Sequence, residues 1–285
     1  TEAHMLMDAA GVAKFHERKK HADNKPWIIN VQNQKGGTGK SMTAVHLAAC
    51  LSLNLDKRYR ICLIDLDPQG NASTGLGVED RDLSSYDLLI EGAKLADVTQ
   101  KTKVDGIDVV PATTDLSSAD VELSDNEKRI VLLRNAFSAA DLRAYDYVFM
   151  DCPPSLSLLT VNALVAADSV LVPLQAEFFA LEGLSQLMLT VRQVREGANS
   201  ELRIEGVVLT MYDLRNNLSK LVEDDARQTL GELVYETKIP RNVRLSEAPS
   251  FAQTVLDYDA TSTGALAYKA LAEEIVARHD AVKSR

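Results

Sequence analysis

Residues 28–41 read IINVQNQKGGTGKS, and this stretch decides the fold. The apolar run Ile28–Asn33 is typical of a buried strand, a glycine-rich turn follows it, and Ser41–Leu55 has a helical pattern. Backbone N–H groups of such a turn can close around phosphate oxygens, and the N-terminus of the next helix adds the positive end of its dipole. The order of strand, turn, lysine, hydroxyl and helix predicts a phosphate-binding loop.

The loop departs from the common pattern G-x-x-x-x-G-K-[ST]. The first glycine of that pattern would stand at position 34, where this chain has Gln34, and Lys35 precedes the glycines instead. We expect Lys40 to reach the terminal phosphates and the Ser41 hydroxyl to bind Mg²⁺. Lys35 is therefore a second lysine beside a phosphate site that one lysine already serves. The predicted nucleotide-binding residues of the loop are Lys35, Gly36, Gly37, Thr38, Gly39, Lys40, Ser41 and Met42.

Length and composition are those of an ordinary globular enzyme. The chain has 285 residues, and 46% of them are hydrophobic, which is ample for a large core. Its three cysteines lie far apart without C-x-x-C spacing, which argues against a disulfide framework and a zinc site. No apolar run approaches the ~18 residues of a transmembrane helix. We expect a flexible leader over residues 1–26, which has no secretory signal pattern, and a single domain over residues 27–285.

Predicted strands and helices alternate along the chain. Strands that are apolar at nearly every position are buried on both faces, so the predicted class is α/β, with a mostly parallel twisted sheet flanked by helices on both faces. The predicted strands are Ile28–Asn33, Arg60–Leu66, Ile107–Pro111, Tyr147–Met150, Ser169–Pro173, Ile204–Thr210 and Leu233–Lys238. The predicted helices are Ser41–Leu55, Ser155–Ala166, Leu181–Glu196, Leu218–Leu230 and Thr263–His279. A capping box at Ser124–Glu127 predicts one more helix, to about Ala140, whereas residues 68–106 are irregular.

Three aspartates stand at or just after the ends of predicted strands and are expected to meet at the phosphate site. Asp151 follows an apolar run as a Walker B aspartate does, and it would hold Mg²⁺ through water while Ser41 holds it directly. Side chains two apart point the same way along a strand, so Asp65 and Asp67 could both face the phosphates. One of them would then support the metal or Lys40, and the other would position the attacking water. The alternative is that either aspartate only caps the turn that follows.

The net charge of −10 does not favour a nucleic-acid binder, but a phosphate backbone responds to a local patch. Basic residues recur between positions 203 and 244. Arg215 follows a predicted strand, and Arg241 and Arg244 lie in the loop Pro240–Pro249, from which side chains can grip phosphates without reading bases. These three arginines are the DNA-binding candidates. The alternatives are that they are ordinary solvated arginines, or that Arg241 supports the nucleotide loop.

Four segments resemble the ParA/Soj family of DNA-partition ATPases. They read QKGGTGKS (34–41), DLDPQGNA (65–72), DCPPSL (151–156) and PRNVRLSEAPS (240–250), and matching motifs extend from about residue 26 to the C-terminus. The family belongs to the deviant-Walker-A class of P-loop NTPases, with MinD and the nitrogenase iron protein. One departure is Met42, where members usually carry a second threonine.

The resemblance implies an enzyme that hydrolyses ATP with Mg²⁺ and forms an ATP-dependent homodimer. It also implies non-specific binding of double-stranded DNA, stimulation by a ParB-like centromere-binding partner, and segregation of chromosomes or plasmids. Such a protein would be cytoplasmic and nucleoid-associated and would not bind a membrane.

The same resemblance implies roles for single residues. Lys35 looks like the signature lysine that reaches the phosphates of the other subunit, in the manner of an arginine finger. Asp67 corresponds to the catalytic aspartate, so the predicted catalytic residues are Lys35, Lys40 and Asp67, and the predicted metal site is Ser41, Asp65 and Asp151. Pro240 and Asn242 would lie near the adenine, although an asparagine in a proline-rich turn also suits plain turn chemistry. For DNA, the resemblance favours Arg215 and Arg244.

Three other functions stay open. A MinD-like membrane-site ATPase needs a C-terminal amphipathic helix with large apolar and basic residues, and residues 273–285 contain no phenylalanine, tyrosine or tryptophan. An iron–sulfur reductase needs two suitably placed cysteines, and Cys152 is the only one expected near the site. A ParA-like protein that positions another cargo, such as a chemoreceptor cluster, would share the same ATPase residues.

Overall fold

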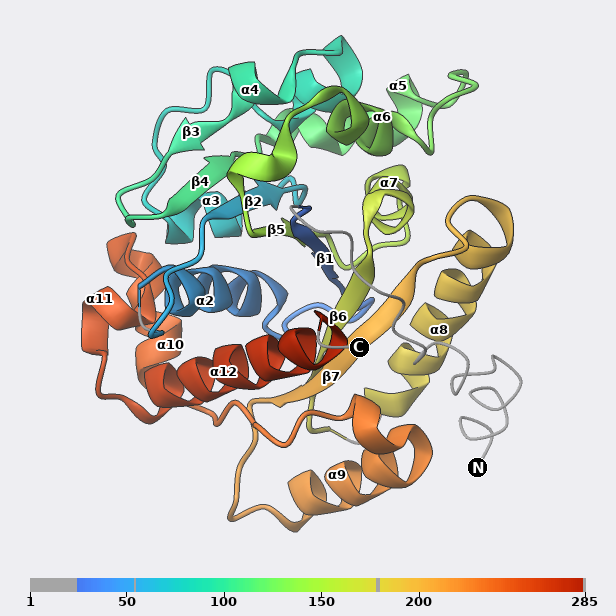
Figure 1. Ribbon diagram of the computed structural model, residues 1–285. Helices are drawn as coiled ribbons and strands as arrows, with labels where there is room; N and C mark the ends of the chain where they lie inside the picture. The colour runs from blue at the N-terminus through green and yellow to red at the C-terminus, as the bar shows by residue number, and fades with distance from the viewer. Residues whose placement is uncertain (1–24, 54, 178–179, 284–285) are drawn as a thin grey trace.

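The computed structural model describes residues 25–53, 55–177 and 180–283. A seven-stranded sheet runs through its centre in the order β3-β4-β2-β5-β1-β6-β7 (Figure 1). Every neighbouring pair is parallel except β3 and β4, which confirms the predicted class. The strands are β1 (Trp27–Val31), β2 (Ile61–Asp65), β3 (Gln100–Lys101), β4 (Ile107–Val110), β5 (Tyr147–Asp151), β6 (Ser169–Gln175) and β7 (Arg203–Thr210).

Helices cover both faces of the sheet (Figure 1). One hydrophobic cluster joins α2 and α12 to one face, and a second joins α7, α8 and α9 to the other. The α-helices are α2 (Lys40–Leu53), α3 (Asn71–Gly75), α4 (Leu95–Val98), α5 (Ala119–Glu122), α6 (Leu132–Ala139), α7 (Leu158–Ala166), α8 (Ala180–Gly197), α9 (Asn217–Leu230), α10 (Val243–Glu247), α11 (Val255–Asp259) and α12 (Thr263–Lys283).

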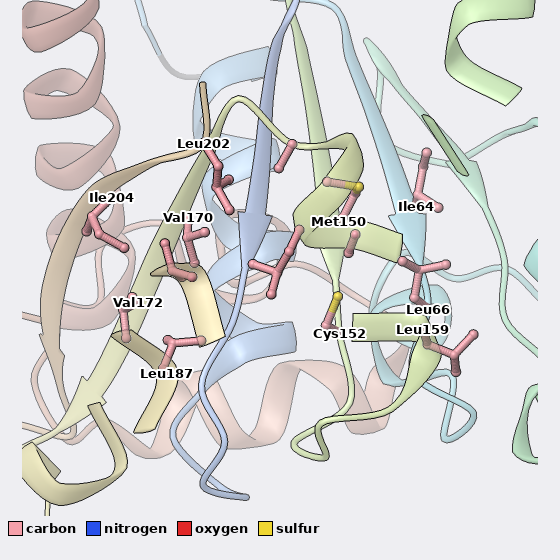
Figure 2. Close-up of a cluster of buried hydrophobic side chains, with 14 of the residues drawn as sticks. Ile64, Leu66, Met150, Cys152, Leu159, Val170, Val172, Leu187, Leu202 and Ile204 are labelled. Carbon is pink, nitrogen blue, oxygen red and sulfur yellow. The ribbon is translucent and has the colours of Figure 1, made fainter. Parts of the chain in front are cut away.

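Strand β5 shows why these apolar runs form a central sheet. Val148 and Met150 face the α7 and α8 side, whereas Tyr147 and Phe149 face the α2 and α12 side, and all four are buried. Figure 2 shows part of the cluster on the α7 and α8 side, in which Met150 lies among side chains of several strands and helices. Burial of each large apolar side chain contributes roughly 1.5–3 kcal/mol, so a strand apolar on both faces is stable only between two helical layers.

Two predicted elements differ from the structure: one helix begins later than predicted, and one strand does not form. The capping box does not start a helix, because α6 begins only at Leu132 and the preceding residues form turns. There the Asn126 side chain accepts the Lys128 N–H at 2.8 Å, a local bond that competes with helix formation. Residues 233–238 form no strand apart from one bridge between Val234 and Val207. The next N–H groups, of residues 236 and 237, are bound instead by the Glu274 carboxylate.

Two other expectations concern less regular segments. Residues 68–106 contain α3, α4, the short strand β3 and a π-helical turn over Asp87–Glu91. The predicted leader lies outside the described residues except for its last two, Lys25 and Pro26. None of the helices in the described part of the chain combines the length and the apolar character that crossing a membrane requires.

Candidate nucleotide site

The candidate site lies at the carboxyl edge of the sheet, where three neighbouring strands end together. Asp151, the last residue of β5, is in register with Val31 at the end of β1 and with Asp65 at the end of β2. The phosphate loop leads from β1 to α2 at this edge, beside a cavity of about 690 Å³. Of the site residues predicted from the sequence, those that line this cavity are Gly36, Gly37, Gly39, Lys40, Ser41, Met42 and Asp67.

The loop glycines leave their backbone open to this cavity. Gly37 and Gly39 adopt φ values of 76° and 86°, a left-handed conformation that side chains strongly disfavour. A Cβ atom built on Gly36, Gly37 or Gly39 would meet nothing within 4 Å. The bare backbone therefore faces free space at the start of a 14-residue helix, which is the geometry of a phosphate cradle.

Lys40 lies inside this cradle. Its side chain is buried, and its ammonium donates a 3.3 Å hydrogen bond to the carbonyl oxygen of Lys35. Burial lowers the pKa of Lys40, while the carboxylates of Asp151 and Asp67 oppose that change. An ammonium held by a single weak bond among carboxylates can exchange that bond for phosphate oxygens.

Lys35 lies outside the cradle. Its ammonium is 2.6 Å from a carboxylate oxygen of Glu177, and the two side chains are 42% and 44% exposed. Lys35 does not line the nucleotide cavity, although it stands only five residues before Lys40. The two loop lysines thus point to different places.

Asp151 supplies the unsatisfied acceptors that a metal site needs. It is fully buried, and neither carboxylate oxygen has a hydrogen bond of standard geometry, although the Ser41 hydroxyl lies close enough to lower its pKa in part. Burial first, and then the neighbouring Asp65, raise the pKa of Asp151 well above its ordinary value. No group of three or more histidine, cysteine, aspartate or glutamate side chains that could hold a metal ion occurs among the described residues.

The Asp67 side chain lies at the cavity, whereas the Asp65 side chain does not. Strand β2 ends at Asp65, so the alternation of side chains does not continue to Asp67. Asp67 lines the cavity and accepts the N–H of Gln69 at 3.0 Å. Asp65 does not line it, and its buried carboxylate is bound by Ser73 and by the N–H of Asp67.

A second, smaller cavity of about 170 Å³ adjoins the first. Gly39, Met42 and Met211 line both cavities. Pro240, Arg241 and Asn242 line the smaller one. The Asn242 side chain also caps α10 by accepting the Arg244 N–H at 2.8 Å, so the turn chemistry considered from the sequence is present too.

The three candidate arginines are exposed but differ in their contacts. Arg215 lies in the turn before α9, in which its N–H binds the Asp213 side chain. Arg244 forms ion pairs with Glu247 at 2.9 Å and with Asp259 at 3.5 Å. Arg241 lines the smaller cavity.

Several lining residues were missed from the sequence. Pro68, Gln69, Asn71, Pro153, Pro154 and Pro249 belong to motifs that carried the family resemblance, so their place could have been predicted. No sequence signal marks Met211, which has a left-handed φ of 49°, or His46, whose pKa burial lowers to about 3.

Known proteins show both sequence and structural similarity to this chain. Residues 27–204 match a family described as an AAA domain. The chromosome partitioning protein ParA of Caulobacter vibrioides is 50% identical over 254 residues, which cover 88% of this chain and 94% of that protein. The sporulation initiation inhibitor protein Soj of Bacillus subtilis is 49% identical over 252 residues, with 88% and 98% covered. The structure of cobyrinic acid a,c-diamide synthase from Mycobacterium smegmatis with ADP and magnesium aligns with a TM-score of 0.77 and 31% identity, over 90% of this chain and 96% of that one.

Proposed function

Since this chain belongs to the ParA/Soj family of chromosome-partitioning ATPases, within the broader AAA domain family, we propose that it partitions DNA by cycling between an ATP-bound dimer and a released monomer. The dimer binds double-stranded DNA without sequence preference. A ParB-like partner stimulates hydrolysis, and the protein then leaves the DNA.

One observation carries this proposal: the two loop lysines have separate environments. Lys40 lines its own nucleotide cavity, whereas Lys35 is held on the surface by Glu177. A surface ammonium beside the phosphate loop can serve the triphosphate of a second subunit placed against this face. Positive charge then reaches the γ-phosphate only in the dimer, so ATP favours assembly more than ADP does.

The remaining site residues divide the work of hydrolysis. The loop N–H groups and Lys40 bind the phosphates, and Asp67 positions the attacking water from the cavity wall. The Ser41 hydroxyl and the Asp151 carboxylate would hold Mg²⁺; the fit rests on the unsatisfied Asp151 oxygens beside that serine. When bound, Mg²⁺ neutralises charge that develops on the phosphates. Pro240 and Asn242 hold the adenine in the smaller cavity.

DNA binding is assigned to the exposed arginines. Arg215 is the better placed, because no carboxylate ion pair is formed by its side chain in the described structure, whereas Arg244 must compete with Glu247 and Asp259 for a phosphate. Contacts of this kind fix the protein on the backbone and carry no base specificity. Arg241 is assigned both to the smaller cavity, beside the adenine, and to DNA.

Sedimentation with ATP, Mg²⁺ and a DNA fragment tests the proposal. Lys35→Ala should stay monomeric and lose DNA-bound mass, while Asp67→Ala should dimerise, stay on DNA and hydrolyse ATP slowly. Lys103→Ala is the matched control, since Lys103 is also an exposed lysine that pairs with a carboxylate, Glu79. A Lys35→Ala protein that dimerised and hydrolysed ATP like the wild type would refute the role of Lys35 in the partner's site.

A further inference from the structure

The Asp65 carboxylate is the centre of a buried hydrogen-bond network behind the nucleotide cavity. One oxygen accepts the N–H of Asp67 at 3.1 Å. The other accepts both the N–H of Ser73 at 2.9 Å and its hydroxyl at 2.6 Å. Asp65 and Ser73 are 0% exposed, so water does not compete for these bonds.

The Ser73 hydroxyl links this carboxylate to the next strand of the sheet. While it donates to Asp65, it accepts the N–H of Ala112, just beyond β4, at 3.1 Å. Ser85 adds a second support by donating its hydroxyl to the main-chain oxygen of Asp65 at 2.6 Å. The end of β2 is thus tied to α3, to the chain after β4 and to the segment after residue 84.

We infer that Asp65 and Ser73 form a positioning pair that sets Asp67 in its place at the cavity wall. This inference rests on the proposed catalytic role of Asp67. Strand pairing ends at Asp65, and Asp67 lines the cavity two residues later. Between those residues the bond from the Asp67 N–H to the Asp65 carboxylate fixes the turn, and Ser73 fixes the carboxylate.

The alternative is that Asp65 binds the metal, and a count of free acceptors favours Asp151 over Asp65 in that role. A carboxylate offers about four lone-pair sites. Hydrogen bonds use three of those of Asp65, whereas none of standard geometry uses those of Asp151. The free acceptors at the end of the neighbouring strand β5 are therefore those suited to Mg²⁺ and its waters, and Asp65 acts through Asp67.

Steady-state hydrolysis of Ser73→Ala tests the inference. This variant removes the link between Asp65 and Ala112, and small displacements of a reacting group cost about 10- to 100-fold in rate. We expect kcat to fall about tenfold or more, with the KM for ATP and the Mg²⁺ concentration for half-maximal rate within about twofold of the wild type. ATP-dependent dimerisation, followed by sedimentation, should persist. Ser73→Thr keeps the hydroxyl and should recover most of kcat.

Two further variants keep the result interpretable. Ser52→Ala is the matched control, since Ser52 is 2% exposed and its hydroxyl donates to the Ala49 carbonyl oxygen of its own helix, α2. Asp65→Asn retains size and presents an N–H to donors; it should show the same kinetic profile and replaces Ser73→Ala if that variant does not fold.

The outcomes separate this inference from the proposed function. If Ser73→Ala or Asp65→Asn needed more Mg²⁺ for its half-maximal rate but kept the wild-type kcat at saturating Mg²⁺, Asp65 would be a metal ligand and the inference would be overturned. Wild-type turnover in Ser73→Ala, with slow turnover in Asp67→Ala, would overturn the inference and leave the role of Asp67 standing. Wild-type turnover in both would remove that role itself.

Discussion

The hydroxyl of Thr210 donates a 2.8 Å hydrogen bond to the main-chain carbonyl oxygen of Thr38, which lies 172 residues away in the phosphate loop. Both residues are buried. Thr210 ends β7, and the next residue, Met211, has a left-handed backbone and lines both cavities. Strand β7 therefore supports the phosphate loop from the side and leads into the turn that carries Arg215.

This contact predicts that Thr210→Val weakens nucleotide binding. The substitution keeps the shape but leaves the Thr38 carbonyl without its side-chain donor, at a cost of about 1–3 kcal/mol for a buried group. Part of that cost destabilises the binding conformation of the phosphate loop. We therefore expect ADP affinity to fall about three- to tenfold, measured by calorimetric titration. Thr190→Val is the control, because the Thr190 hydroxyl donates to the Gln186 carbonyl oxygen within its own helix, α8. Unchanged affinity in Thr210→Val would mean that the loop holds its shape without β7.

The contact between Lys35 and Glu177 predicts that Glu177→Gln strengthens ATP-dependent dimerisation. An exposed ion pair contributes about 0.2–1 kcal/mol, and this pair must open before Lys35 can reach another subunit. Its loss should tighten the dimer by about 1.4- to 5-fold per subunit, measured by analytical ultracentrifugation with ATP and Mg²⁺. Glu196→Gln removes the same charge from an exposed pair with Arg192 and should change nothing. A weaker dimer in Glu177→Gln would show that Glu177 itself belongs to the interface.

Salt dependence measures the contribution of Arg215 to DNA binding. If Arg215 and Arg244 each contact one phosphate, a dimer neutralises about four, and the slope of log K against log salt is about −3.6. Arg215→Ala should reduce the slope to about −1.8 while dimerisation is preserved. Arg192→Ala on α8 is the control and should leave the slope unchanged. An unchanged slope in Arg215→Ala would exclude this residue from the DNA contact.

The lowered pKa of Glu223 leads to a prediction for the pH dependence of folding stability. Although burial raises the pKa of Glu223, hydrogen bonds from Lys238, Tyr212 and Arg227 lower it more strongly, to about 2. The folded pKa lies below the unfolded value near 4.5, so the stabilisation is fully present above that value and is lost as pH falls toward about 2.

Glu223→Gln should therefore lower the free energy of unfolding by about 1–3 kcal/mol at pH 7. The difference from the wild type should shrink as the pH falls below about 4.5, measured by urea unfolding. Glu196→Gln, at an exposed pair, should show almost no difference at either pH. If the difference in unfolding free energy between Glu223→Gln and the wild type stayed constant down to pH 3, the loss would come from side-chain shape and not from charge.

Elements built from strong local patterns could be predicted from the sequence. The buried strands and the helices α2, α7, α8, α9 and α12 were predicted within a few residues, because apolar periodicity reports burial directly. The two wrong elements show where such patterns fail. After Ser124, a local hydrogen bond to the Asn126 side chain replaces the predicted helix start. In residues 233–238, two N–H groups that a strand would use for pairing donate instead to the Glu274 carboxylate of α12.

The sequence by itself determined the buried strands, the long helices, the phosphate loop and the three aspartates at or just after strand ends, because each depends on neighbouring residues and on the side-chain period of a strand or helix. Only the tertiary structure decided which way those residues point. Lys35 turns to Glu177 and Lys40 to the cavity, while Asp65 turns to Ser73 and Asp67 to the cavity. These directions follow from contacts between segments far apart in the chain, which compete for the same few donors and acceptors.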